Sequence, residues 1–141
     1  MSELNLVEKV IALESVELMN RLSPDQLASL ATIATEVRFA PGRAILEGHR
    51  PVDALYVVVD GQVELKQSGE PLDTVGPAAV LGMWALFDDG ELTALSATAR
   101  EDTRLLRISR DEFYDLLADN SDITSAMFST LFSRFKKLVT Q

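Results

Sequence analysis

One segment of the chain, "VLGMWALFDDGELTALSATARED" from Val80 to Asp102, has the residue types of an anion-binding loop. It contains a glycine, a short apolar stretch that fits one helical turn, and then small hydroxyl residues. The free backbone N–H groups at the start of such a turn suit a bound phosphate. The segment has no basic residue before Arg100, however, so it lacks the cation that usually clamps a phosphate.

Few other residues could carry chemistry. His49 is the only histidine and the chain has no cysteine, which excludes a histidine-rich metal site, thiolate chemistry and disulfides. Asp88 and Asp89 fall in "FDDG", a composition typical of a solvated turn. No serine lies in the surroundings of a nucleophile elbow. We therefore expect the protein to be neither an enzyme nor a metal-binding protein.

Composition and charge limit the class of protein further. The 141 residues, 47% hydrophobic and 25% charged, fit a single globular domain over 1–141. With a formal net charge of −9 the chain gains nothing from counterion release, so we expect it to bind no nucleic acid by itself. No apolar run approaches about 18 residues, and the N-terminus lacks the layout of a signal peptide. We expect a cytoplasmic protein without membrane contact.

Residues 1–36 have the pattern of helices. An apolar stripe at three-to-four spacing, broken only by Glu14, predicts one buried helix face. Its members are Leu4, Val7, Val10, Ile11 and Leu18. A second helix is expected to begin after Ser23, a good N-cap, with Pro24 at the first helical position. Its expected buried residues are Leu27, Leu30, Ile33 and Ala34.

Residues 37–108 predict short antiparallel strands. All seven glycines and four of the five prolines lie here, between runs such as "ALYVVVDG", "QVELKQ" and "TRLLRIS". Short strands with turns about every eight to twelve residues are typical of a sandwich or barrel. In "VVVDGQVEL" we predict a tight hairpin, with Asp60 and Gly61 as its two positive-φ residues. In the strand that follows, Val63 and Leu65 would face the core.

Residues 109–141 return to helices. Ser109 with Glu112 three residues later predicts a capping box, and Ser121 or Asp122 would cap the last helix. The last helix carries a wide apolar stripe, formed by Ile123, Met127, Phe128, Leu131, Phe132, Phe135 and Leu138. Core packing could absorb only half of a stripe this wide. The remaining half predicts a contact with another subunit.

The order helix, β-roll, helices resembles the cyclic-nucleotide-binding domain of catabolite activator proteins and protein kinase A regulatory subunits. The resemblance covers roughly residues 22–141 and rests on "PGRAILEG", "ALYVVVDGQVEL" and "TRLLRISRDEFYDLL". The matching positions are Pro41, Gly42, Ile45, Gly48, Leu55, Tyr56, Val58, Gly61 and Val63. It implies a mainly β fold, an antiparallel β-roll of the jelly-roll type with flanking helices at both ends.

The resemblance also places the family's phosphate-binding cassette on residues 80–99. There the family uses backbone amides and an arginine for the cyclic phosphate, and a glutamate for the ribose hydroxyl. The equivalent ligand-pocket residues here are Gly82, Met83, Trp84, Ala85, Leu95, Ser96 and Ala97. Met83 replaces the glutamate and Leu95 the arginine. Since losing one partner of a buried charge pair costs about 2–5 kcal/mol, affinity should fall by about 30-fold to several thousand-fold.

Two functions follow from this cassette. In the favoured interpretation Met83, Trp84 and Leu95 pack the pocket shut, which leaves a dimerisation or protein-interaction module without a cofactor. The alternative is a ligand sensor that binds cyclic AMP or cyclic GMP weakly, or another small molecule, in the pocket. In the transcription regulators that the chain resembles, the last helix pairs with its twin. We accordingly expect a homodimer through Met127, Phe128, Leu131, Phe132 and Phe135.

Overall fold

The computed structural model describes residues 3–83 and 95–139. Its helices are α1 (Leu6–Glu14), the 3-10 helix η1 (Glu17–Met19), α2 (Pro24–Ile33), α4 (Arg110–Asp119) and α5 (Ser121–Val139). Its strands are β1 (Ala34–Phe39), β2 (Ala44–Leu46), β3 (Ala54–Asp60), β4 (Val63–Gln67), β5 (Glu70–Val75), β6 (Val80–Leu81), β7 (Leu95–Ala99) and β8 (Thr103–Ser109). The chain forms two compact units: a helical unit, Met1–Ile33 with Asp111–Gln141, and a roll, Ala34–Arg110.

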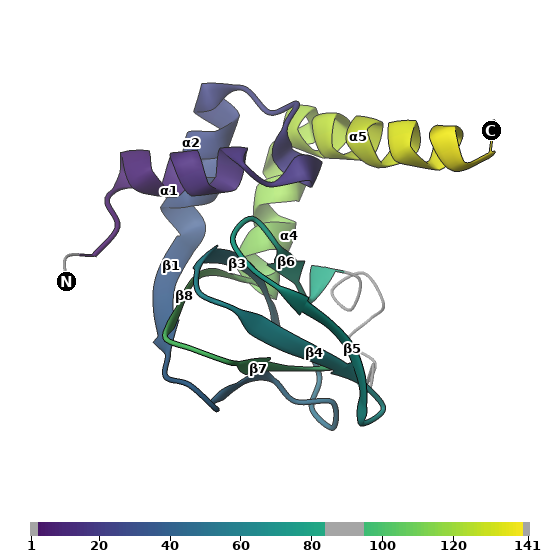
Figure 1. Ribbon diagram of the computed structural model, residues 1–141. Helices are drawn as coiled ribbons and strands as arrows, with labels where there is room; N and C mark the ends of the chain where they lie inside the picture. The colour runs from purple at the N-terminus through teal and green to yellow at the C-terminus, as the bar shows by residue number, and fades with distance from the viewer. Residues whose placement is uncertain (1–2, 84–94, 140–141) are drawn as a thin grey trace. The chain divides into compact units, whose positions relative to one another are not determined.

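The roll consists of two four-stranded antiparallel sheets (Figure 1). One sheet has the strand order β1-β8-β3-β6 and the other the order β2-β7-β4-β5. All five residues from Ala54 to Val58 on β3 are buried, so this strand is covered on both faces. The side chains of the roll with no exposed surface include Leu55, Val57, Val63, Leu105 and Leu106. The predicted antiparallel β-roll with flanking helices is confirmed.

The hairpin predicted at Asp60 and Gly61 is wrong. β3 pairs with β8 and β6, whereas β4 pairs with β5 and β7, so the chain crosses here from one sheet to the other. Only Gly61 has a positive φ, +108°. A Cβ atom on Gly61 would lie 2.6 Å from the Cα atom of Thr103. The glycine is therefore required by the close approach of β8, which the local dipeptide does not reveal.

The boundary between helix and strand also differs from the prediction. β1 begins at Ala34, so the last three residues of the predicted helical segment 1–36 belong to a strand. The whole of β1 pairs with β8 in continuous register, from Ala34 opposite Ile108 to Phe39 opposite Thr103. Tertiary pairing of this kind overrides a weak local helix preference. A single domain over 1–141 stays a prediction.

The buried face predicted for the first helix is wrong. Val7 and Ile11 are 65% and 63% exposed, while Leu13, outside the predicted stripe, is fully buried. α1 packs against α2 and η1, and this packing uses the side that carries Leu13. The stripe correctly predicted a helix. It did not identify the side of the helix that packs against α2 and η1. The start of α1 is fixed by a reciprocal capping box between Asn5 and Glu8.

Local signals located the other helix starts well. The Ser23 hydroxyl accepts a hydrogen bond from the Gln26 backbone N–H at 3.2 Å, while the Gln26 side chain accepts one from the Ser23 N–H at 2.8 Å. α4 begins directly after Ser109, as predicted. α5 already includes Ser121 and Asp122, so the expected cap lies one or two residues too late, and Asn120 precedes the helix. In α2, Leu27 and Leu30 are buried as expected.

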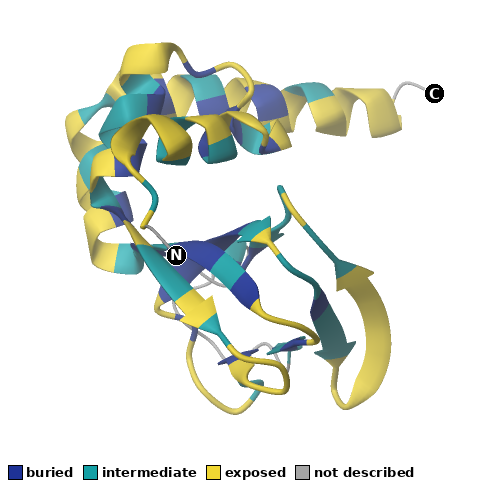
Figure 2. Cartoon of the chain, turned by 60° about the vertical axis from the view of Figure 1, so that its left-hand side comes forward, coloured by how far each residue is buried: buried dark blue, intermediate teal, exposed yellow. Residues whose placement is uncertain are grey.

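α5 has one buried and one exposed apolar face (Figure 2). Ile123, Met127 and Thr130 are buried. The exposed set, named here the α5 face, consists of Phe128, Leu131, Phe132, Phe135, Leu138 and Val139, 38% to 77% exposed. The wide stripe in the sequence is thus two adjacent faces with different surroundings. None of the described helices is long and apolar enough to cross a membrane.

Candidate functional site

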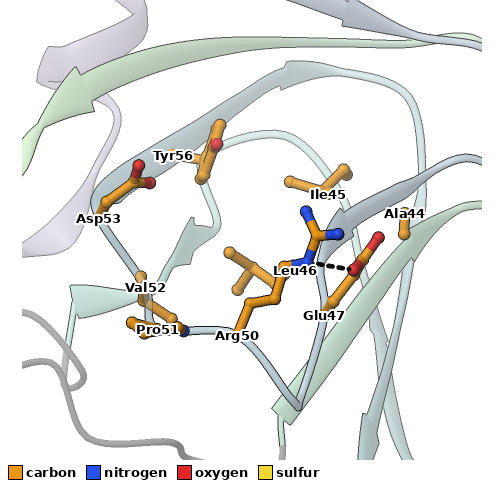
Figure 3. Close-up of a pocket in the computed structure, with 9 residues that line it drawn as sticks. All are labelled: Ala44, Ile45, Leu46, Glu47, Arg50, Pro51, Val52, Asp53 and Tyr56. Carbon is orange, nitrogen blue, oxygen red and sulfur yellow. Dashed lines mark ion pairs between the residues drawn. The ribbon is translucent and has the colours of Figure 1, made fainter.

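A cavity of about 260 Å³ opens in the roll between β2 and the start of β3 (Figure 3). The loop that joins the two strands forms much of its wall, because it has to return the chain from one sheet to the other. The lining residues are Ala44, Ile45, Leu46, Glu47, Arg50, Pro51, Val52, Asp53 and Tyr56. The volume is somewhat below the range of about 300–1,000 Å³ that is usual for sites of drug-sized ligands.

The charged side chains of the cavity wall are held in ion pairs. Arg50 places its Nε atom 3.2 Å from the Oε2 atom of Glu47, the pair drawn with a dashed line in Figure 3. Asp53 is paired with Arg107 at 3.5 Å. The wall therefore presents two carboxylates and a single guanidinium, and that guanidinium already has an anionic partner. An added anion would have to compete with Glu47 for the Arg50 guanidinium.

The first end of the cassette lies against this wall. Gly82 follows β6 and has a φ of +86°, a conformation that side chains disfavour. A Cβ atom at this position would lie 2.9 Å from the carbonyl oxygen of Ala54 and 3.0 Å from a methyl group of Val52. The glycine is thus needed both for its backbone conformation and for the close contact with the cavity wall. Met83, the next residue, is half-buried.

The second end of the cassette forms β7. Ala97 is fully buried and lies opposite Leu46, which lines the cavity. Leu95 and Ser96 are half-buried and lie opposite Gln67 and Lys66 of β4. Leu95 and Ala97 share one face of the strand because side chains alternate. Gly82 and Ala97 therefore both adjoin the wall of the same cavity, although Trp84 and Ala85 lie outside the described residues.

Two cations beside β7, Arg100 and Lys66, lie in ion pairs on the sheet. Arg100 follows β7, is 57% exposed and lies 3.8 Å from Glu64. Lys66, opposite Ser96, is also 3.8 Å from Glu64. Arg100 thus lies on the surface of the roll. One carboxylate shared by two cations at this distance is a surface interaction of small energy.

Of the other residues considered for chemistry, the structure describes only His49. His49 is 75% exposed in the loop after β2, with its Nε2 atom 3.3 Å from Glu47. Within residues 3–83 and 95–139, no group of three or more His, Cys, Asp or Glu side chains could hold a metal ion. Asp88 and Asp89 lie outside the described residues.

Four polar residues of the cavity wall were not predicted from the sequence. Glu47, Arg50 and Asp53 lie in the loop between β2 and β3, and Tyr56 lies on β3. The charged run "EGHRPVD" between two apolar segments was the available signal. A run of this kind is far more often a solvated loop, and only the tertiary fold brings it over a cavity.

The predicted dimer residues divide into two groups. Met127 is 6% exposed and is therefore packed within its own chain. Phe128, Phe132 and Phe135 are 58% to 66% exposed, and Leu131 is 38% exposed. On the other side of α5, Arg21 donates hydrogen bonds to the hydroxyls of Ser129 and Ser133 at 2.6 and 3.0 Å. α5 is held by that side, which leaves the α5 face uncovered.

Comparisons with known proteins agree on one family. A family model described as "Cyclic nucleotide-binding domain" matches residues 36–120. The cAMP-dependent protein kinase regulatory subunit of Aspergillus fumigatus is 32% identical over 113 residues, 79% of this chain and 27% of that protein. A CRP-like cAMP-activated global transcriptional regulator of Mycobacterium tuberculosis is 26% identical over 121 residues, 82% of this chain and 54% of that protein. The chain thus spans 27% to 54% of the length of these two relatives.

A solved structure agrees with the fold. The N-terminal domain of a transcriptional regulator from Streptomyces coelicolor A3(2) superposes with a TM-score of 0.81 at 26% identity. The match covers 90% of this chain and 94% of that one. It therefore includes helices as well as the roll.

Proposed function

The chain belongs to the cyclic nucleotide-binding domain family, and we propose that it is a cytoplasmic regulatory module with impaired binding of cyclic AMP and cyclic GMP. In this proposal the module acts through dimerisation or protein interaction rather than through a bound nucleotide. Its relatives include a kinase regulatory subunit and a transcriptional regulator, so a regulatory role is common to the group.

One observation carries the proposal: the half-buried Leu95 stands where the resemblance places the arginine for the cyclic phosphate. Arg50 lines the adjoining cavity, but it is paired with Glu47. To bind a phosphate it would have to give up that carboxylate. The N–H groups at a helix N-terminus in general offer only about 0.3–1 kcal/mol to an anion, against about 2–5 kcal/mol for a buried charge pair.

Calorimetric titration of cyclic AMP and cyclic GMP tests this part of the proposal. We expect dissociation constants in the high micromolar range or weaker, and a low-micromolar constant would contradict impaired binding. The variant Met83→Glu with Leu95→Arg should then bind at least about 30-fold more tightly, since it restores both polar anchors. Met83→Gln with Leu95→Met is the control. It introduces unbranched side chains at both positions without restoring either charge.

The α5 face supports the second part of the proposal. Exposed phenylalanines at 128, 132 and 135 form a contiguous apolar strip, which is unusual for a protein surface that meets only water. Burying it against a twin helix would contribute about 25 cal/mol per Å² of apolar surface. In a two-fold dimer each of these residues would meet its own copy or a near neighbour.

Sedimentation velocity of the wild-type chain tests the dimer. We expect a dimer at high micromolar concentration and a folded monomer for Phe128→Asp with Phe135→Asp, because both side chains are exposed in the single chain. Leu72→Asp, which introduces the same charge at a 59% exposed leucine of the roll, should remain dimeric. A wild-type chain that sediments as a monomer would refute this part.

The cavity favours a second candidate, a sensor of another small molecule. A volume of about 260 Å³ with a phenol, two carboxylates and a guanidinium in its wall suits a small polar compound. A thermal-shift screen of small polar metabolites would identify such a ligand. A shift that Tyr56→Phe and Arg50→Ala both abolish would favour this function over a module without a ligand.

A further inference from the structure

A second uncovered apolar surface lies on α1. Leu6, Val7 and Ile11 are 50%, 65% and 63% exposed, and together they are named here the α1 face. At about 100° per residue, Glu14 falls between Leu6 and Ile11 around the helix. Glu14 is exposed, so this apolar face has a carboxylate at its C-terminal end. The residue that interrupts the apolar stripe in the sequence thus belongs to this face.

The apolar side chains in the C-terminal half of α5 are exposed, although Ser133 and Arg134 bond to Arg21 and Glu17 of the same chain. None of residues 131–139 is buried, and in Figure 1 this half of α5 extends beyond the other helices of the helical unit. Leu138 and Val139 are 77% and 64% exposed at its far end. Lys136 falls at the edge of the α5 face, next to Phe132 around the helix. An isolated helical segment of this length is marginal in water without a tertiary contact.

The two surfaces carry opposite charge. The segment that includes α1 contains Glu3, Glu8, Glu14 and Glu17 with a single Lys9. The second half of α5 contains Arg134, Lys136 and Lys137 and no carboxylate. Within one chain Arg134 already lies 3.5 Å from Glu17, so the basic end of α5 accepts carboxylates of the N-terminal segment.

We propose that the α1 face is the docking surface for the C-terminal half of α5 from a second copy of this chain. The inference rests on the proposed dimer and adds a second contact to it. Residues 128–135 pair with their twins, Leu138 and Val139 pack on Val7 and Ile11 of the partner, and Lys136 pairs with the partner's Glu14. In a two-fold dimer the contact forms twice, which neutralises both basic clusters. The acidic charge beside the α1 face disfavours an anionic lipid surface as its occupant.

Sedimentation equilibrium with Val7→Asp combined with Ile11→Asp tests the docking surface. Both residues are exposed in the single chain, so folding should be retained, as circular dichroism would verify. The dimer dissociation constant should rise by about 10-fold or more, because two apolar contacts become buried carboxylates. Leu72→Asp controls for the added charge and should leave the constant unchanged.

A charge exchange tests the pairing of Glu14 with Lys136. Glu14→Lys and Lys136→Glu should each weaken the dimer by about three-fold, the range of an exposed ion pair. The double variant should recover the wild-type constant, which a purely structural effect of either change would not produce. Single variants that weaken the dimer without recovery in the double variant would overturn the pairing.

The outcomes separate this inference from the proposed dimer. A wild-type dimer that is unaffected by the α1 variants, yet dissociated by Phe128→Asp with Phe135→Asp, would overturn the α1 docking surface alone. A wild-type monomer would overturn both.

Discussion

The roll and the helical unit differ in how completely they cover their apolar side chains. Among the described residues, Leu72 is the only large apolar side chain of the roll that is exposed. In the helical unit the α1 face and the α5 face are both open. The roll instead shows ion pairs on its surface, such as Arg104 with Asp60 and Arg38 with Glu36.

This difference indicates where the two units contribute to function. The surface of the roll is polar, and several of its charged side chains form ion pairs. The roll therefore gains little from covering its surface with a second protein. A helical unit with two uncovered apolar faces gains free energy when another surface covers them. In the proposed function, the helical unit makes the contacts with a partner, and the roll does not.

The largest expected effect distinguishes buried from exposed phenylalanine within the helical unit. Phe113 on α4 is fully buried, so Phe113→Ala should lower the free energy of unfolding by about 3–5 kcal/mol. Phe132 is 58% exposed, so Phe132→Ala should change it by less than about 0.5 kcal/mol in the monomer. Urea denaturation at a concentration that keeps the chain monomeric measures both. Equal losses would mean that the α5 face belongs to the core of the single chain.

A smaller effect is expected at the crossing between the two sheets of the roll. Gly61→Ala should lower the free energy of unfolding by about 3 kcal/mol, since it adds a close contact with Thr103 to a positive φ. Gly42→Ala is the matched control, because Gly42 has a φ of +86° but no atom within 4 Å of an added Cβ. For Gly42→Ala the free energy of unfolding should fall by only about 1–2 kcal/mol, the cost of the positive φ alone. If the two variants lose the same free energy, the close approach of β8 is not what requires the glycine.

A stabilising change is expected in the turn before β6. Ala78 has a φ of +77°, and its N–H donates a hydrogen bond to the carbonyl oxygen of Val58 at 2.9 Å, which fixes the turn on β3. Ala78→Gly should raise the free energy of unfolding by about 0.5–1 kcal/mol, because it relieves a left-handed conformation. Ala79→Gly, at a neighbouring residue without a positive φ, should lower it instead. Thermal denaturation of both variants would reveal any departure from this opposite behaviour.

The smallest effect concerns pH and Asp122. The hydrogen bond from Gln26, at 2.7 Å, is the main cause that lowers the pKa of Asp122 below its ordinary value of 3.8, with the backbone N–H of Ile123 adding to it. A lowered pKa in the folded state means that the ionised carboxylate stabilises the fold above pH 3.8. This contribution is lost as the pH falls through the lowered value. Asp122→Asn should therefore be less stable than wild type at neutral pH and equal to it in strong acid.

The comparison for Asp122 requires acid denaturation followed at several pH values. Gln26→Ala removes the donor of the hydrogen bond to Asp122. Its stability difference from wild type should therefore change with pH as the difference for Asp122→Asn does. A difference between wild type and Asp122→Asn that persists unchanged into strong acid would contradict the assigned cause.

Much of the fold could be predicted because its signals are local. Ser23 with Pro24 located the start of α2, and the spacing of Gly42, Gly48 and Gly61 between apolar runs indicated the roll and its family. Ser23, Pro24 and Gly42 act through capping and backbone conformation, which depend on neighbours within a few positions, whereas Gly61 is also required by the close approach of β8. The cassette ends could be placed by the same means, since Gly82 and Ala97 occur in a recognisable order.

What the sequence by itself determined, then, is the period and order of the elements, the exclusion of thiolate chemistry and of a histidine-rich metal site, and the apolar residues at Met83 and Leu95. Only the tertiary structure decided that Leu13 rather than Val7 is buried, that the chain changes sheets at Gly61, and that α5 carries two separate apolar faces. A pattern along the chain specifies which side chains share a side of a helix or strand, but burial depends on which other surface reaches that side. That surface comes from residues distant in sequence, so no local pattern encodes it.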